Sequence, residues 1–217
     1  MPCRVPSGNC YKRRNHWGRK GSCVPTIALC LLLTACGGAG EEPSANLRNL
    51  YHDMTGCTME ATVTCDQEGL EWEASLRCDY VPDGETMVEV LAPETIAGVK
   101  AVVSGSDWQL EYEGERLNAG ALSQEEISPA LCLPRLMDAL RDGWLLEENE
   151  ESWNDIPCLR LCVDQTGLQN GKIVSTVWLQ QEGGTPLRGE IAVDGEIILT
   201  AEFTSFAFYD TIKPQEN

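Results

Sequence analysis

Histidine is scarce in this chain of 217 residues: only two are present, and His52 alone follows residue 35. No G-x-S-x-G elbow, H-E-x-x-H motif or glycine-rich phosphate loop occurs. Cys57 and Cys65, like Cys158 and Cys162, lack the C-x-x-C spacing of zinc ribbons and thioredoxin-like motifs. We therefore expect no enzymatic activity, no metal site and no cofactor.

Basic residues are also few beyond the N-terminus. The chain has 16 Lys and Arg against 34 Asp and Glu, and its net charge is −18. Six of the basic residues and none of the acidic ones precede Cys36, so the chain from Cys36 onward carries −24. Such a charge repels nucleic acid and anionic lipid head groups, so we expect no nucleic-acid partner. A role at a membrane would then depend on a covalent anchor.

No apolar run is long enough to span a bilayer, because a spanning helix needs about 20 apolar residues. The run Pro25–Thr34 has ten residues and follows the basic N-terminus, which is typical of a signal peptide. It leads into Leu33-Thr34-Ala35-Cys36, which resembles the lipobox of bacterial lipoproteins. That resemblance implies an extracytoplasmic protein, anchored to the membrane by diacylglycerol and a fatty acid such as palmitate on Cys36.

The lipobox divides the chain into three predicted parts. Residues 1–35 are a lipoprotein signal peptide, and residues 36–45, which begin with small residues, are a flexible tether. Residues 46–212 are long enough for one domain with a sizeable core.

Two helices are expected from apolar residues at helical spacing. The first is Ser44–Met54, with Leu47, Leu50, Tyr51 and Met54 on one face. The second is about Pro134–Asp142, within a segment whose apolar positions are Leu131, Leu136, Met137, Leu140 and Trp144.

A hairpin is the most informative strand pattern. Cys57–Cys65 and Leu70–Cys78 each alternate apolar and polar residues, which predicts two half-buried strands. A four-residue loop at Asp66–Gly69 would oppose Cys57 to Cys78 and so predicts a disulfide between them. Buried thiols in an anaerobic habitat are the alternative, and the pairing of the other cysteines, Cys65, Cys132, Cys158 and Cys162, is left open because six cysteines allow fifteen pairings.

Further short strands bounded by Gly or Pro fill the rest of the chain. They are Met87–Ala92, Gly98–Ser104, Trp108–Tyr112, Pro157–Asp164, Ile173–Gln181, Leu187–Val193 and Glu196–Phe208. A three-residue loop at Asp194-Gly195 would oppose Ile191 to Ile197. The predicted fold class is α+β, mainly β: about ten antiparallel strands in one domain, with two or three helices that cover a sheet.

The order of these elements resembles the LolA/LolB-like lipoprotein-localisation fold over about Asn46–Asp210. The segments that carry the resemblance are VEVLAPETIAGV (88–99), DWQLEY (107–112), SPALCLPRLMDAL (128–140) and GEIILTAEFTSFAF (195–208). The resemblance implies a single curved sheet that forms an unclosed half-barrel, with an apolar concave face partly lidded by helices. In the namesake carrier that hollow takes acyl chains. A subset in spore-forming Clostridia looks like the germination lipoproteins, which act through a protein partner.

The resemblance places eight residues on the concave face: Val63, Trp72, Leu76, Val88, Val90, Trp108, Leu110 and Tyr112. Two departures limit the transfer of function. The carrier is a soluble shuttle, whereas Cys36 would tether this chain. The carrier also has an inward Arg that latches its lid, and the inward positions of the second strand here offer none.

Two functions follow as hypotheses. In the first, a non-enzymatic lipoprotein binds a lipid or other amphiphile on its concave apolar sheet, at the outer face of the membrane. In the alternative, the core is filled by Trp72, Trp108 and Trp144 and takes no ligand. The protein is then an interaction or scaffold lipoprotein, for example in spore germination or envelope maintenance, and its acidic rim or open sheet edge docks a protein partner or a second copy as a homodimer.

Overall fold

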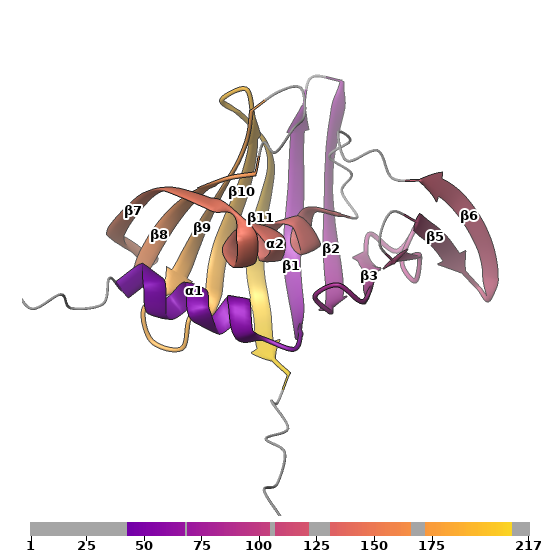
Figure 1. Cartoon of the computed structure of the whole chain (residues 1–217). Coiled ribbons are helices and arrows are strands. Elements are labelled where there is room, and N and C mark those ends of the chain that lie inside the picture. Colours follow the sequence, from indigo (N-terminus) through magenta and orange to yellow (C-terminus); the bar gives the residue numbers. More distant parts are fainter. Residues whose placement is uncertain (1–42, 68, 105–106, 122–130, 166–171, 210–217) are drawn as a thin grey trace, which may run out of the picture. The chain divides into compact units, whose positions relative to one another are not determined.

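The computed structural model describes residues 43–67, 69–104, 107–121, 131–165 and 172–209. Residues Glu41–Asn217 form one compact unit, which contains two helices and one sheet of eleven strands (Figure 1). The helices are α1 (Pro43–Asp53) and α2 (Cys132–Asp142). The strands are β1 (Cys57–Gln67), β2 (Leu70–Tyr80), β3 (Glu85–Ala92), β4 (Lys100–Ser104), β5 (Asp107–Tyr112), β6 (Glu115–Ala121), β7 (Trp144–Trp153), β8 (Ile156–Asp164), β9 (Ile173–Gln180), β10 (Pro186–Val193) and β11 (Glu196–Phe208).

The sheet is antiparallel throughout and its order is β6-β5-β4-β3-β2-β1-β11-β10-β9-β8-β7. The chain starts at the centre with β1 and runs outward through hairpins to the edge strand β6. It then continues through α2 to the opposite edge strand β7 and returns by hairpins to β11, which pairs with β1. The predicted fold class, a mainly β chain with one unclosed antiparallel sheet and covering helices, is confirmed.

Helix α2 packs on one face of the sheet, which we call the inner face (Figure 1). Its apolar side is fully buried over β2 and β8–β11, and Gly189 of β10 provides the room for it. A Cβ atom at Gly189 would lie 2.5 Å from the Leu136 side chain, so only glycine lets the helix approach the strand this closely. The buried α2 side chains are Cys132, Leu133, Pro134, Leu136, Met137, Ala139 and Leu140.

Helix α1 packs beside α2 and against the end of the sheet. Tyr51 is completely buried, stacks edge-on against Phe208 of β11 at 5.3 Å, and donates a hydrogen bond of 2.5 Å to the Gly184 carbonyl. The helix begins at Pro43, so residues 43–45 belong to it and not to the tether predicted over residues 36–45. Neither of the two described helices is long and apolar enough to cross a membrane.

The first hairpin keeps the predicted faces but not the predicted register. Gln67 pairs with Leu70, so the loop has two residues, with Gly69 at φ 82°. Cys57 therefore faces Tyr80 and Cys78 faces Met59, a shift of two residues that leaves the same side chains buried. The predicted opposition of Cys57 and Cys78 is wrong: the two are diagonal neighbours, and both are free thiols. The disulfide was predicted because a four-residue loop would oppose the two cysteines. The two-residue loop of the structure removes that reason.

Other expectations are corrected at the sheet edges. Strands β6 and β7 were not expected from the sequence. Trp144, which was grouped with the apolar positions of the second helix, opens β7 with 77% of its surface exposed. Ile191 faces Leu199 and not Ile197, because a bulge follows Ile191. Residues 128–130 of the quoted segment 128–140 lie outside the described residues.

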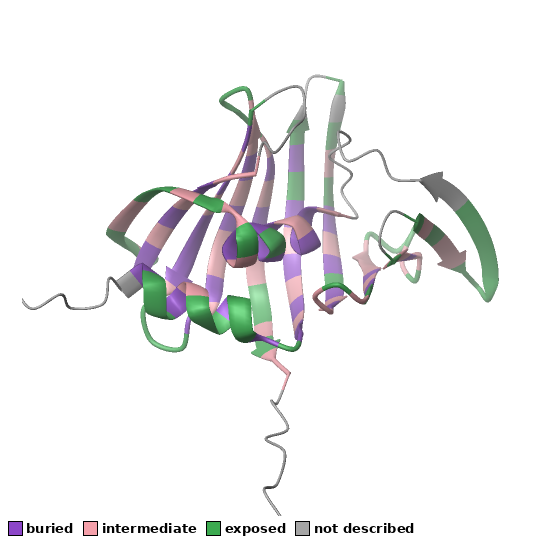
Figure 2. Cartoon of the chain, viewed as in Figure 1, coloured by how far each residue is buried: buried purple, intermediate pink, exposed green. Residues whose placement is uncertain are grey.

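The outer face of the sheet is polar. Arg77 of β2 lies between Glu60 of β1 and Glu89 of β3, at 2.7 and 3.7 Å. Arg188 of β10 makes the same kind of cross-strand pair with Glu202 of β11 at 3.2 Å. Alternate residues therefore sort to an apolar inner face and a charged outer face, as the period of the strand requires (Figure 2).

The cysteines give the first testable prediction. Burial raises the pKa of the Cys57 and Cys132 thiols to about 12, and both are almost inaccessible. Iodoacetamide at about pH 8 should therefore modify the half-exposed Cys162 in the native segment 41–217, because alkylation requires an accessible thiolate. Mass spectrometry should find the five buried cysteines labelled only after unfolding.

The same experiment tests the disulfide. Unfolding without reductant should expose six alkylatable thiols in this segment. A result of four, with Cys57 and Cys78 unlabelled, would show that the two are bridged and would contradict the free thiols of the structure.

Candidate functional site

The eight residues predicted for the concave face all lie on the inner face, but in different surroundings. Cross-strand pairing joins them side by side from β1 to β5. Val63, Leu76 and Val88 are buried in the core, and Trp72 and Val90 are partly buried against it. The remaining three, Trp108, Leu110 and Tyr112, lie on β5 outside the core cluster.

A strip of apolar side chains continues the inner face onto β4–β6, and neither of the two described helices lies over it. Helix α2 packs over β2 and β8–β11 and does not extend over β5 and β6 (Figure 1). Ala101 of β4 pairs with Leu110, and Leu110 pairs with Leu117 of β6. Tyr112 is 47% exposed and Leu117 is 69% exposed. We call this set the apolar strip: Val103, Trp108, Leu110, Tyr112 and Leu117.

Trp72 lies on the inner face of β2 opposite Cys65, beyond the residues of β2 that pair with β3. Its ring packs against the core, but its indole N–H is buried and has no hydrogen-bond partner among the described residues. An unpaired buried N–H costs about 1–3 kcal/mol, and such groups are uncommon in native proteins. The site therefore offers an apolar surface and, on β2, one indole N–H donor that has no partner among the described residues.

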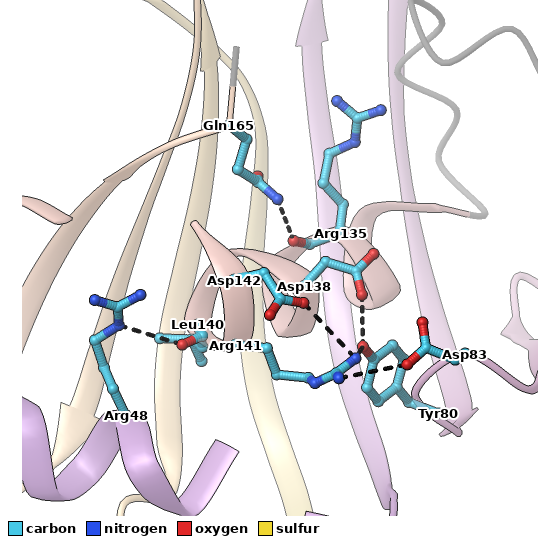
Figure 3. A network of polar contacts seen from close by, with 9 residues as sticks. All are labelled: Arg48, Tyr80, Asp83, Arg135, Asp138, Leu140, Arg141, Asp142 and Gln165. Atoms are coloured by element: carbon cyan, nitrogen blue, oxygen red, sulfur yellow. Dashed lines mark hydrogen bonds and ion pairs between the residues drawn. The ribbon is translucent and has the colours of Figure 1, made fainter. Parts of the chain in front are cut away.

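The second feature of the site is a polar latch that fixes α2 to β2 (Figure 3). The Tyr80 hydroxyl donates a hydrogen bond of 2.5 Å to Asp138, and Arg141 donates one of 3.3 Å to the same hydroxyl. Burial raises the pKa of the Asp138 carboxyl, although the Tyr80 hydrogen bond opposes that shift. Burial, and then the bond to Asp138, raise the pKa of Tyr80. Tyr80 therefore stays protonated and remains a donor across the physiological pH range.

The sequence interpretation missed this latch. It noted the lack of an inward Arg on the second strand, whereas Tyr80 continues the inward row of β2 and the Arg comes from α2. The alternation that predicts the even positions from 70 to 78 to be inward predicts the same for residue 80, so the signal was present. Tyr80 was not included because the predicted strand ended at Cys78.

Helix α2 is held on two further sides. Arg48 of α1 donates hydrogen bonds to the Leu140 carbonyl at 3.3 Å and the Gly143 carbonyl at 2.6 Å, at the helix C-terminus. Gln165, after β8, donates to the Arg135 carbonyl at 3.0 Å (Figure 3). It also accepts a hydrogen bond of 2.5 Å from Ser175. The helix is thus a fixed part of the core in this structure.

In the part of the chain that the structure describes, no three His, Cys, Asp or Glu side chains are placed to hold a metal ion. His52, the one histidine after residue 35, is exposed on α1. The apolar strip presents aromatic and aliphatic side chains, and a ligand would gain from it by leaving water.

The comparisons with known proteins find matches among solved structures alone. No family model and no curated protein sequence matches the chain. The chain is similar to a LolA-superfamily structure. This is protein NE2245 from Nitrosomonas europaea, with 11% identity, a TM-score of 0.43, and coverage of 78% of this chain and 93% of that one.

Two mycobacterial structures are similar to the same extent. LprF from Mycobacterium bovis has 12% identity and a TM-score of 0.45, and the match covers 81% of this chain and 96% of the LprF chain. Lipoprotein LppX from Mycobacterium tuberculosis has 13% identity and a TM-score of 0.41, and covers 79% and 93%. At this identity no residue role is carried over to this chain.

The latch gives a prediction about stability. Tyr80→Phe removes the donor to Asp138 and the acceptor for Arg141 while it keeps the ring, so it should lower the free energy of unfolding by about 1–3 kcal/mol in urea titrations. Tyr112→Phe is the matched control, because its hydroxyl has no partner among the described hydrogen bonds and it is half exposed. Equal effects of the two substitutions would refute a stabilising role of the latch.

Proposed function

We propose that this chain is a membrane-anchored, non-enzymatic lipoprotein whose apolar strip binds an acyl chain of a lipid or of another amphiphile at the outer face of the membrane. The observation that carries the proposal is the continuity of the strip with the core. Every strand from β2 to β6 carries apolar side chains on the inner face, although the described helix that fills this face ends over β2.

The dimensions of the surface fit an elongated apolar ligand. Four strand spacings separate β2 from β6, which makes about 19 Å across the sheet at ~4.8 Å per spacing. Each methylene group of a bound chain that leaves water contributes about 0.8 kcal/mol. A chain lying across the strands from Leu117 toward β2 would cover side chains such as Tyr112 and Leu117, which are exposed among the described residues.

The polar end of such a ligand would meet the Trp72 indole. A carbonyl oxygen of an ester or carboxylic acid can accept a hydrogen bond from the Trp72 indole, which has no partner among the described residues. This pairing would also fix the orientation of the ligand, with its polar end at β2 and its tail toward β6.

The filled part of the inner face limits where a ligand can lie. Leu133, Leu136, Met137 and Leu140 occupy the face over β2 and β8–β11 and leave those side chains completely buried. The alternative hypothesis, a core filled by the protein's own side chains, fits this part of the inner face. The side chains that fill it come from α2 and not from Trp144. The ligand in our proposal therefore lies on β3–β6 and not beneath α2.

A pair of substitutions on β5 tests the proposal. Leu110→Glu places a charge within the apolar strip, whereas Gln109→Glu adds the same residue on the outer face of the same strand. We expect Leu110→Glu to weaken binding of a fluorescent long-chain fatty acid at least about tenfold, because the buried charge would lose hydration. Gln109→Glu should bind as the unmodified chain does.

Unfolding titrations of both variants show whether the fold is retained. If the unmodified chain binds no fatty acid, or if both variants bind alike, the apolar strip is not the binding site.

A second function rests on the β7 edge of the sheet. Trp144 is 77% exposed and Leu146 is 45% exposed on this edge strand, which also carries Glu147, Glu148, Glu150 and Glu151. An open edge with exposed apolar and acidic side chains can pair with an extended basic segment of a protein partner, or with a second copy in a homodimer. Crosslinking in cells that recovers only the monomer would count against it.

The anchor is a separate part of the proposal and has its own test. Cys36→Ala in the full chain should abolish labelling by a fatty-acid analogue in cells and release the protein from the membrane fraction. Cys30→Ala, which alters another cysteine in the same apolar run, should leave both unchanged. If the Cys36 variant stays labelled and membrane-bound, the interpretation of residues 1–36 as a lipoprotein leader is wrong.

A further inference from the structure

The groove between α1 and α2 collects basic side chains in an otherwise acidic chain. It has a volume of about 360 Å³ and lies at the other end of the unit from the apolar strip, so it is independent of the proposed ligand. Only ten Lys and Arg follow Cys36, against 34 acidic residues. Two of the ten and the single histidine of this part line the groove. The complete lining is Ser44, Ala45, Arg48, Asn49, His52, Arg141 and Leu145.

The sequence of α1 places these side chains on one side of the helix. Ala45, Arg48, Asn49 and His52 recur at i, i+3, i+4 and i+7, which is one helical face. The core-facing residues Leu47, Tyr51 and Met54 follow a different set of positions. The polar face is therefore built into the same helix that supplies a part of the core.

Arg48 is the main charged group of the groove. Two of its five N–H groups bond the carbonyls at the end of α2, so three donors remain. No carboxylate lies within ion-pair distance of it among the described residues, unlike Arg77, Arg160 or Arg188. The two carbonyl bonds hold the guanidinium in place, and among the described residues no ion pair compensates its positive charge.

Arg141 and the nearby acids modify this charge. Arg141 pairs with Asp83 at 3.7 Å and Asp142 at 3.9 Å, and both carboxylates are largely exposed to water, so its charge is only partly offset. Glu148 accepts a hydrogen bond of 3.3 Å from the Ser44 amide at the edge of the groove. An anion would therefore bind toward Arg48 and His52, away from Glu148.

We propose that this groove binds a phosphate group. Planar guanidinium groups pair well with phosphate oxygens, and the groove has room for a phosphate ester with its substituent. Ser44 is eight residues from Cys36, a reach of at most about 28 Å, so a lipidated Cys36 would keep the groove close to the head groups of the bilayer. The phosphate could thus belong to a lipid head group or to a soluble phosphate ester.

His52 reports directly on the groove. It is the only histidine in the segment 41–217, which contains all the core residues from Leu47 to Ala201, so its imidazole proton NMR signals need no assignment. Inorganic phosphate added to this segment at constant pH and ionic strength should shift those signals with a saturating dependence. No saturating shift would overturn the proposal.

Two identical substitutions on α1 make the test specific. Asn49→Glu adds a carboxylate within the groove, whereas Asn46→Glu adds one at an exposed position outside its lining. We expect Asn49→Glu to weaken phosphate binding at least about tenfold and Asn46→Glu to change it by less than about twofold. Equal weakening by both would show that phosphate responds only to net charge, and would overturn the site.

Sedimentation with vesicles distinguishes the two sources of phosphate. If the segment sediments with vesicles of phosphatidylglycerol in phosphatidylcholine but not with phosphatidylcholine alone, and Asn49→Glu abolishes this, the groove binds a lipid head group. If free phosphate binds and neither vesicle does, the groove binds a soluble phosphate ester. Loss of fatty-acid binding in Leu110→Glu with unchanged phosphate binding would separate this site from the apolar strip.

Discussion

The packing of α2 on the inner face is the interaction on which the rest of the structure depends. The chain builds the sheet from its centre to the β6 edge and must then reach the β7 edge before it can return to pair β11 with β1. The helix lies on that connection and fills the inner face as it crosses. Gly189 opens the space for Leu136, and Arg48 and Tyr80 fix the two sides of the helix.

This crossing divides the inner face into two parts with different roles. Over β2 and β8–β11 the side chains of α2 complete a core that excludes a ligand. Over β4–β6 the apolar side chains continue without either described helix above them, and our proposal places the ligand there. In that proposal, the two hypotheses that the sequence left open, a lined hollow and a filled core, apply to different strands of one sheet.

Period-two alternation predicts which face of the sheet a side chain lies on, but it does not predict the cross-strand register. Period-two patterns identified the inward rows of β1 and β2 correctly, yet the register was wrong by two residues, because a shift by an even number keeps every side chain on its face. Only the length of the loop distinguishes the two registers, and the loop decides whether Cys57 opposes Cys78. Strands β6 and β7 were missed because edge strands with polar residues on both faces have no such pattern.

The sequence by itself determined the composition of the inner face, the two helices and the mainly β class, because side-chain periodicity is a local property of helix and strand. The tertiary structure decided which strands α2 covers, that Trp144 is exposed, and that Arg48, His52 and Arg141 line one groove. These features join residues up to about a hundred positions apart. They depend on how the connection between β6 and β7 crosses the sheet, and no local pattern encodes that path.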